Sequence, residues 1–377
     1  MAPIRVLQVM PAMDAGGMET FVMNVYRTID RDKVQFDFLY HYDKPCFFDD
    51  EICTLGGNIY KMTVRQDNNL PRYLRELREL FAAHPEWRII HGHYSGFGMF
   101  YNPVARRAGI PVRVGHSHNT AYEPNLVGRL DRFMSSFFSA GLTDRFACSE
   151  KAGQMLYGSK PFTVVPNGID TARFAARDPQ RRALLRGELG VTDQEILFGH
   201  VGRFSAQKNH PGLLKMFAAL RAQDPRMRLV LIGGGEMGYV EKMRDLAQEL
   251  NLGRSVIFAG VRSDVPALYD AMDAFVLPSL FEGLPVVGME AQASGLPCVF
   301  STGVTEEVLL RPDSCRISLE QPDEAWAAVL KDADRNLPDR AQAAAQVRAA
   351  GYDIRQETLR LQQLYTSLIA KRGAAHA

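Results

Sequence analysis

The stretch Glu282-Gly283-Leu284-Pro285-Val286-Val287-Gly288-Met289-Glu290 contains the pattern that decides the fold of this chain. It follows the apolar run Ala274–Leu277 and precedes a glycine and a proline that stop a helix, so it predicts a strand, a loop and a helix. Pro285 suits the first turn, where its missing N–H costs nothing. Glu282 is then expected in the loop and Glu290 in the helix. The helix N-terminus between the carboxylates favours an anion, so a sugar, a ribose and a diphosphate together would suit the segment.

Short apolar runs alternate with helical patterns on both sides of this stretch. Continuous Val/Ile/Leu runs separated by helices indicate parallel sheets that are covered on both faces. The runs that predict strands are Ile4–Met10, Phe36–Tyr40, Ile89–His91, Val112–Gly115 and Phe162–Val165, and then Ile196–Val201, Leu229–Ile232, Val256–Ala259 and Ala274–Leu277.

Two successive sets of this kind predict an α/β protein with two Rossmann-like, doubly wound domains. A chain of 377 residues has room for both. We expect residues 1–170 to form the first domain and residues 171–353 the second. Residues 354–371 predict an amphipathic helix within the C-terminal segment 354–377.

The composition excludes several classes of protein. Hydrophobic residues make up 46% and charged residues 23%, as in ordinary globular proteins. A formal net charge of +1 gives no support for a nucleic-acid partner. The five cysteines are scattered, odd in number and without metal-type spacing, which favours a reduced, cytoplasmic compartment. No signal-peptide layout and no apolar run of about 20 residues is seen, so a lipid-linked partner would be reached from the membrane surface.

Candidate ligand-binding residues follow the predicted strands, where open α/β sheets bind their ligands. Gly16 and Gly17 lie between the first strand and a helix, and glycine lets backbone N–H groups approach a phosphate or a sugar closely. A simple turn explains a lone Gly-Gly equally well. Arg203 and Lys208 follow the strand Ile196–Val201, and two cations can stabilise a departing diphosphate without a metal. Solvated surface charges are the alternative.

Histidine pairs follow two neighbouring strands. His116 and His118 alternate along the chain, so their side chains point the same way if the strand Val112–Gly115 continues. His91 and His93 form a second pair, which we interpret as shaping the site. A lone histidine here is more often a packed structural residue. The pairs lack nearby carboxylate or thiolate ligands at metal spacing, so no metal is expected.

Two further features suggest contacts with a nucleotide. Gly234 is the middle residue of three glycines after the strand Leu229–Ile232, where the backbone can approach a ligand closely, although a flexible loop is the alternative. Glu290 would be a carboxylate within an apolar helix, and it needs a partner if it is buried. For Glu282, complementarity with the helix dipole is a sufficient structural explanation.

At these residues the chain resembles glycosyltransferase family 4, retaining enzymes of the two-domain GT-B fold, and in particular bacterial capsular and exopolysaccharide glycosyltransferases. The matching motifs span most of the chain in the order of the family: Ala15 to Thr20, Gly115-His116-Ser117-His118-Asn119, Ala147 to Glu150, Pro166 to Asp170, Gly202-Arg203-Phe204 with Lys208-Asn209-His210, and Glu282 to Glu290.

The resemblance implies two domains facing across a cleft, with the C-terminal helix crossing back to the first domain. The first domain would bind the acceptor and the second the nucleotide-sugar donor. Arg203 and Lys208 would bind the donor phosphates, with Gly16 and Gly17 over the diphosphate. Glu290 would bind the ribose, and the nucleotide base would lie near Arg262. Glu282 would face the transferred sugar, which His118, or else His116, would also reach.

The resemblance therefore implies a metal-independent, retaining hexosyltransferase that moves a sugar from a nucleotide-sugar, expected to be a UDP-sugar, to a glycan or lipid-linked glycan in exopolysaccharide or capsule biosynthesis. No cofactor is expected beyond that substrate. The alternatives are an epimerase or a phosphorylase on the same fold, or a non-catalytic subunit that binds a sugar-nucleotide.

Residues 126–140 predict a helix that carries Arg129, Arg132 and three phenylalanines. A basic amphipathic face could rest on an anionic membrane, which would place the protein peripherally at the inner face of the cell membrane. Burial of the phenylalanines in the core is the alternative.

Overall fold

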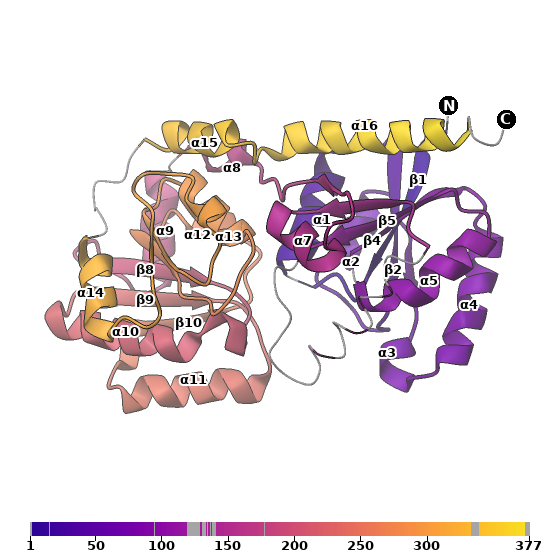
Figure 1. Ribbon diagram of the computed structural model, residues 1–377. Coiled ribbons are helices and arrows are strands. Elements are labelled where there is room, and N and C mark those ends of the chain that lie inside the picture. The colour runs from indigo at the N-terminus through magenta and orange to yellow at the C-terminus, as the bar shows by residue number, and fades with distance from the viewer. Residues whose placement is uncertain are drawn as a thin grey trace. The chain divides into compact units, whose positions relative to one another are not determined.

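The computed structural model describes residues 2–14, 16–93, 95–118, 141–176, 178–332 and 339–373, together with residues 129, 133, 135 and 137 (Figure 1). The chain divides into two compact units. Unit 1 comprises Met1–Gly168 and Ile354–Ala377, and unit 2 comprises Ile169–Asp353. Unit 2 therefore lies in sequence between two parts of unit 1.

Unit 1 is built on a seven-stranded sheet in the order β3-β2-β1-β4-β5-β6-β7, in which all neighbours pair in parallel. The sequence order changes direction at β1 and β4, which is where doubly wound sheets bind ligands. The strands are β1 (Ile4–Met10), β2 (Val34–Tyr40), β3 (Ile59–Lys61), β4 (Trp87–Gly92), β5 (Val112–Ser117), β6 (Asp144–Ala147) and β7 (Thr163–Val164).

Helices cover this sheet because each buries one apolar stripe against it. In α4 (Leu70–Ala83) the buried side chains are Tyr73, Leu77 and Phe81, which recur every four residues, and Asn69 caps the first turn by accepting from the Arg72 N–H. The other helices of unit 1 are α1 (Gly17–Thr28), α2 (Asp49–Thr54), α3 (Val64–Asp67), α5 (Ser95–Arg107), α7 (Glu150–Tyr157) and α16 (Ile354–Gly373).

The helix α16 completes the core of unit 1. Ile354, Leu361, Tyr365 and Leu368 are buried in the same hydrophobic cluster as residues of β1, β2 and α1. Figure 1 shows α16 as the yellow helix that runs over the strands of this unit. The predicted return of the C-terminal helix to the first domain is confirmed.

Unit 2 repeats the plan on a six-stranded parallel sheet in the order β10-β9-β8-β11-β12-β13, which changes direction at β8 and β11. Its strands are β8 (Ile196–Val201), β9 (Met227–Ile232), β10 (Val256–Gly260), β11 (Ala274–Leu277), β12 (Cys298–Ser301) and β13 (Cys315–Ile317). Its helices are α8 (Thr171–Phe174), α9 (Pro179–Glu188), α10 (His210–Gln223), α11 (Met237–Glu249), α12 (Val265–Leu268), α13 (Val286–Ala293), α14 (Asp323–Asp332) and α15 (Arg340–Ala349). The predicted fold class is thus confirmed.

The helix α13 includes the second half of the stretch from Glu282 to Glu290. It starts at Val286, so Pro285 lies one residue before the helix rather than inside it, with an extended ψ of 121°. The helix ends at Ala293, and Gly295, the residue after the C-cap Ser294, takes a left-handed φ of 74° that other residues rarely adopt. Seven of its eight residues are buried, including Glu290. A helix buried on nearly all sides is fixed firmly in the unit.

None of the helices in the described part of the chain is both long enough and apolar enough to cross a membrane.

Candidate active site

The cations and carboxylates of unit 2 gather at the carboxyl ends of β8 and β11. Arg203 follows β8 directly, and Lys208 ends a short 3-10 turn, Ala206–Lys208. Glu282 follows β11 by five residues. These two strands flank the position where the strand order changes direction, so the sheet topology brings together residues that are 74 or more positions apart.

Lys208 and Glu282 form an ion pair between Nζ and Oε1. Both side chains are largely buried, with exposures of 15% and 13%. The Ser279 hydroxyl donates to the same carboxylate oxygen at 3.3 Å. A ligand phosphate that binds to Lys208 must therefore compete with Glu282 for the ammonium group.

The loop that carries Glu282 is held on both sides. The Glu282 N–H donates to the Gly303 carbonyl at 3.0 Å, and the Gln207 side-chain amide donates to the Phe281 carbonyl at 3.0 Å. Gly303 has no room for a side chain, because a Cβ there would lie 2.3 Å from the Leu280 carbonyl oxygen. These contacts fix the backbone of the loop, and the fixed backbone helps to position the Glu282 carboxylate.

Arg203 is exposed, and no hydrogen bond or ion pair of its side chain occurs with any residue that the structure describes. Its backbone is fixed: the neighbouring Phe204 N–H donates to the Gly234 carbonyl at 2.7 Å. Gly233 adopts a φ of 147°, and a Cβ there would lie 2.1 Å from the Gly202 carbonyl oxygen. The loops after β8 and β9 therefore pack backbone to backbone, a use of the glycine run that was not predicted. The Arg203 guanidinium remains available to a ligand.

Glu290 lies in the middle of α13 with 9% of its surface exposed. Its Oε2 accepts a hydrogen bond of 3.0 Å from the Tyr269 hydroxyl. Burial, and then the charge of Glu290, raise the pKa of Tyr269 well above its usual value. Tyr269 therefore stays protonated and serves as the donor that a buried carboxylate needs.

Arg262 lies after β10, but its guanidinium is bound by carboxylates. It donates twice to Asp264 at 2.7 Å and once to Glu188 at 2.5 Å. These hydrogen bonds raise its pKa further above the usual value. Backbone groups are therefore the part of this segment best able to contact a nucleotide base.

In unit 1 the glycine pair begins α1. Gly16 is the N-cap residue in an extended conformation, and Gly17 is the first helical residue. A Cβ on Gly16 would lie 2.3 Å from the Glu19 carboxylate, whereas a Cβ on Gly17 would meet nothing within 4 Å. The open space at Gly17 lets a ligand approach the helix N-terminus.

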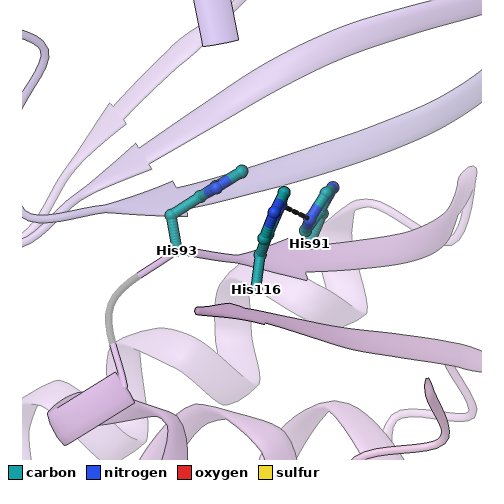
Figure 2. Close-up of side chains that lie close together, drawn as sticks. All are labelled: His91, His93 and His116. Atoms are coloured by element: carbon teal, nitrogen blue, oxygen red, sulfur yellow. Dashed lines mark hydrogen bonds between the residues drawn. The ribbon is translucent and has the colours of Figure 1, made fainter. Parts of the chain in front are cut away.

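The four histidines of the two predicted pairs form one array, in which His91, His93 and His116 are buried and His118 is half-buried. His91 lies in β4, His93 directly after it, His116 in β5 and His118 directly after β5. The strand β5 extends to Ser117, so His116 and His118 do point the same way, with ring centroids 4.2 Å apart. Figure 2 shows the rings of His91, His93 and His116 side by side above the two strands.

Hydrogen bonds join the array into two chains. His91 Nδ1 lies 2.6 Å from the Tyr365 hydroxyl, and His91 Nε2 lies 3.2 Å from His116 Nδ1. His93 Nε2 lies 2.8 Å from the Gln8 Oε1, and His93 Nδ1 lies 2.9 Å from His118 Nε2. Tyr365 belongs to α16, so this helix contributes directly to the array.

Burial keeps these histidines neutral. It lowers the pKa of His91, His93 and His116 well below the usual value, with a further contribution from neighbouring histidines. It lowers the pKa of His118 to about 3. A buried neutral imidazole donates a hydrogen bond from one nitrogen and accepts one at the other. Each ring therefore has one donor side and one acceptor side.

Among the described residues, one group of three, His91, His93 and His116, offers nitrogens that all lie within 4.8 Å of one another, as a metal site requires. The ring orientation does not suit a metal. A metal ion lies in the ring plane of each imidazole ligand, yet the rings of His91 and His93 are stacked with centroids 4.3 Å apart and planes 27° apart. Both nitrogens of each of these two rings already have hydrogen-bond partners. The group therefore fits a hydrogen-bonded array better than a metal site.

The structure thus brings Lys208 and Glu282 together in unit 2, and His116 and His118 together in unit 1. Sequence reasoning missed Gln8, Tyr365, Ser279 and Tyr269, which bind the candidate residues. A polar residue in the middle of the apolar strand β1 was the available signal for Gln8. Asn119 and most of the helix predicted for residues 126–140, including Arg132, lie outside the described residues.

Two family models match the chain. The model described as Glycosyltransferase Family 4 matches residues 15–173, and the model described as Glycosyl transferases group 1 matches residues 182–350. EpsF of Bacillus subtilis (strain 168), which is named as a glycosyltransferase, is 37% identical over 96% of both chains. A UDP-Gal:alpha-D-GlcNAc-diphosphoundecaprenol alpha-1,3-galactosyltransferase of Escherichia coli is 30% identical over 57% of this chain and 58% of that protein.

Solved structures show the same fold at low identity. HepE of Anabaena superposes with a TM-score of 0.80 at 18% identity, over 96% of this chain and 99% of that chain. The lipopolysaccharide glycosyltransferase WaaG superposes with a TM-score of 0.74 at 19% identity, over 95% and 99%. With matching motifs along nearly its whole length, this chain belongs to glycosyltransferase family 4, and it is a hexosyltransferase with the GT-B fold.

Proposed function

We propose that this enzyme transfers a sugar from a UDP-sugar to a glycan or lipid-linked glycan acceptor, with retention of configuration and without a metal ion, in the assembly of an exopolysaccharide. One observation carries the proposal. The exposed Arg203 and the Lys208–Glu282 pair lie at the carboxyl ends of β8 and β11, in the same unit as a buried carboxylate, Glu290.

The diphosphate of the donor is proposed to bind to Arg203 and Lys208. Negative charge grows on the leaving diphosphate as the glycosidic bond breaks, and fixed cations stabilise it more in that state than in the bound substrate. Lys208 exchanges its Glu282 partner for a phosphate oxygen. The released Glu282 carboxylate can then accept a hydrogen bond from a hydroxyl of the transferred sugar.

The ribose of the donor is proposed to bind to Glu290. Tyr269 holds the carboxylate in place through Oε2, and hydroxyl groups of a ribose are donors that a largely buried carboxylate can accept. The nucleotide base is proposed to contact the backbone near Arg262, because the guanidinium there is bound to Asp264 and Glu188.

The choice of UDP is supported by known proteins. HepE structures contain UDP or UDP-glucose, and the Escherichia coli relative is named for UDP-Gal. Another relative, a mannosyltransferase of Mycolicibacterium smegmatis that is 31% identical over 63% of this chain, is named as GDP-mannose-dependent. GDP is therefore the competing donor nucleotide that a test must include.

The acceptor is proposed to bind mainly to unit 1. The name of the Escherichia coli relative includes a diphosphoundecaprenol acceptor, which supports a lipid-linked glycan. Retention without a protein nucleophile means that the acceptor hydroxyl attacks on the face from which the diphosphate leaves.

Calorimetric titration with UDP and with GDP tests the donor site. We expect UDP to bind more tightly, and Lys208→Ala and Glu290→Gln each to weaken UDP binding about 10- to 100-fold, the cost of losing a charged hydrogen bond. Lys215→Ala, which removes an exposed lysine of α10, is the matched control and should bind UDP as the wild type does. Wild-type affinity in both site variants would refute the site.

Metal independence and retention need separate measurements. Donor hydrolysis or transfer should be unchanged by EDTA and by added Mg²⁺ or Mn²⁺, and loss of activity in EDTA that Mn²⁺ restores would contradict the proposal. The anomeric configuration of the product, measured by NMR coupling constants, should match that of the donor. An isomerised sugar-nucleotide formed without an acceptor would favour an epimerase instead.

A further inference from the structure

We propose that Gln8 is a positioning residue that fixes the tautomer of His118, so that His118 presents an unprotonated Nδ1 to its ligand. The ligand group at this position would then be a hydrogen-bond donor, such as a hydroxyl of a sugar or of the acceptor, and not a phosphate oxygen. This inference rests on the proposed function and adds a residue to its site.

The first step is the contact between Gln8 and His93. Gln8 lies in β1, is 1% exposed, and places its Oε1 at 2.8 Å from His93 Nε2. An amide oxygen only accepts hydrogen bonds, so His93 carries its proton on Nε2. The ring is neutral because burial depresses its pKa, and therefore His93 Nδ1 is an acceptor.

The protonation of His93 in turn fixes the tautomer of His118. His118 Nε2 lies 2.9 Å from His93 Nδ1, so His118 must donate there and carries its proton on Nε2. Its Nδ1 is then a lone pair. This atom is buried and has no hydrogen-bond partner among the residues that the structure describes. Burying an acceptor without a hydrogen-bond partner destabilises the folded state. Such unpaired groups are typical of positions where a bound ligand supplies the missing donor.

The orientation of the Gln8 amide decides the outcome, because an amide rotated by 180° would invert every proton position along the chain. The other side of the amide contacts the Tyr365 hydroxyl. The structure places the amide oxygen at 2.8 Å from His93 Nε2, and the amide nitrogen then faces the Tyr365 hydroxyl, where it can donate to the phenol oxygen.

The second hydrogen-bond chain follows from the same orientation. With the amide nitrogen donating to its phenol oxygen, Tyr365 donates to His91 Nδ1, which leaves His91 Nε2 to donate to His116 Nδ1. His116 then carries its proton on Nε2, a buried atom with no hydrogen-bond partner among the described residues.

Figure 2 shows how three rings of the array lie relative to one another. The rings lie side by side, and a dashed line joins His91 to His116 from the neighbouring strand. Ring centroids of His91 and His116 are 5.2 Å apart with planes only 9° apart. Each ring is thus fixed in orientation by its neighbour. Gln8 contacts both hydrogen-bond chains, so its amide decides which nitrogen of each histidine carries the proton.

Long-range proton–nitrogen NMR spectra of the histidines test the proposal, because the two neutral tautomers give different nitrogen shifts. The wild-type protein should show His118 protonated at Nε2, with the assignment made from the His118→Asn spectrum. Gln8→Met, which keeps the length of the side chain without its hydrogen bonds, should give a mixture of tautomers. Protonation of wild-type His118 at Nδ1 would overturn the proposal.

Kinetics separate positioning from a merely structural role. Gln8→Met should lower kcat about tenfold, the effect of one lost hydrogen bond, with calorimetric affinity for UDP unchanged. Gln8→Glu accepts from His93 as the wild type does, so it should preserve the tautomer and more of the kcat. Gln35→Met removes another buried glutamine, which bonds to Tyr26 and to the Leu55 carbonyl, and should change neither the tautomer nor kcat.

The outcomes distinguish this inference from the proposed function. Loss of UDP binding in Lys208→Ala together with an Nδ1-protonated His118 would retain the donor site and reject the role of Gln8. An Nε2-protonated His118 whose tautomer is unchanged in Gln8→Met would also reject that role. If Gln8→Met does not fold, the wild-type and Gln8→Glu spectra still decide the question.

Discussion

The Lys208 ammonium and the Glu282 carboxylate form an ion pair between the loops that follow β8 and β11. The resemblance to the family implies that Lys208 lies at the phosphates and Glu282 at the sugar, but it does not imply their contact with each other. The pair joins the two proposed tasks, because a phosphate that takes up Lys208 also releases Glu282.

Replacement of Glu282 should therefore separate binding from turnover. In Glu282→Gln the ammonium no longer has a charged competitor, so UDP should bind at least as tightly as to the wild type. Turnover should fall by about 100-fold, because the neutral amide is a weaker acceptor for the sugar hydroxyl. Calorimetry with UDP and steady-state kinetics with the donor sugar measure the two effects. Equal losses of affinity and turnover would argue against an exchange of partners.

Arg203 should matter for catalysis and not for folding. It is exposed, with no side-chain partner among the described residues, so Arg203→Ala should shift the free energy of unfolding by less than about 0.5 kcal/mol. Because the guanidinium is proposed to stabilise the leaving diphosphate, kcat/KM should fall about 100-fold. Arg203→Lys should recover part of that loss. Wild-type kcat/KM in Arg203→Ala would exclude contact with the diphosphate.

The glycines of the two units should respond differently to a methyl group. Gly233→Ala should destabilise unit 2 by about 2 kcal/mol or more, because of its φ of 147° and the Cβ contact of 2.1 Å with the Gly202 carbonyl. Gly17→Ala meets open space and should leave stability within about 0.5 kcal/mol, yet reduce activity if a ligand covers the helix N-terminus. Thermal unfolding and donor hydrolysis, measured on both variants, check the contrast; wild-type activity in Gly17→Ala would exclude close contact there.

The stability of unit 1 should fall with acid because its histidines are buried as neutral rings. Burial, with a contribution from Arg65, lowers the pKa of His41 to about 3, whereas the unfolded chain has a pKa near 6.5. Below about pH 6.5 the unfolded chain binds a proton that the folded unit does not bind, so each such histidine removes about 1.4 kcal/mol of stability per pH unit until about pH 3.

His41→Phe should make this pH slope shallower by about 1.4 kcal/mol per pH unit between pH 6 and 4. Tyr73→Phe removes the hydroxyl that lies 2.8 Å from His41 Nε2 but no titrating imidazole, so its slope should stay that of the wild type. Fluorescence of Trp87, in a Trp326→Phe background, reports denaturant unfolding of unit 1. Equal slopes in wild type and His41→Phe would contradict a neutral buried His41.

The phenylalanines of the segment 126–140 allow a test of membrane contact. Phe133 and Phe137 are 63% and 46% exposed, and their ring centroids lie 5.3 Å apart. We propose that they rest on an anionic membrane with Arg129, and expect the double variant Phe133→Ser/Phe137→Ser to float less with anionic vesicles. Leu184→Ser, which removes an exposed leucine of α9, is the control. Equal flotation of all three proteins, or none, would reject the contact.

Much of the fold could be predicted because its central strands are buried over all or most of their length. The strands β1, β8 and β11 have the bounds that their apolar runs predict. The short strands β3, β6, β12 and β13 were not predicted. In β3, β6 and β13, partly exposed polar residues such as Lys61, Asp144 and Arg316 interrupt any apolar run, and pairing with a neighbouring strand defines the strands instead. The strand β12 is buried but has only four residues.

The sequence identifies candidate residues for the site but not the contacts that join them. His116 and His118 are marked by their alternation and by the resemblance to the family. Gln8 and Tyr365 lie 85 and 274 positions from their partners in the array, and no local pattern relates residues so far apart. Such contacts depend on the order of the strands in the sheet and on the return of α16 to unit 1. Neither can be derived from local sequence patterns.

The position of unit 2 between two parts of unit 1 affects synthesis on the ribosome. Ile169 and Asp353, where the chain passes into and out of unit 2, pair side by side. Unit 2 can therefore fold as soon as Asp353 has left the ribosome. At that time unit 1 still lacks α16, so the apolar residues that pack against Leu361 and Tyr365 in the folded unit are exposed. The nascent chain should thus finish its later unit first, and its histidines should acquire their hydroxyl partner only after release of α16 from the exit tunnel.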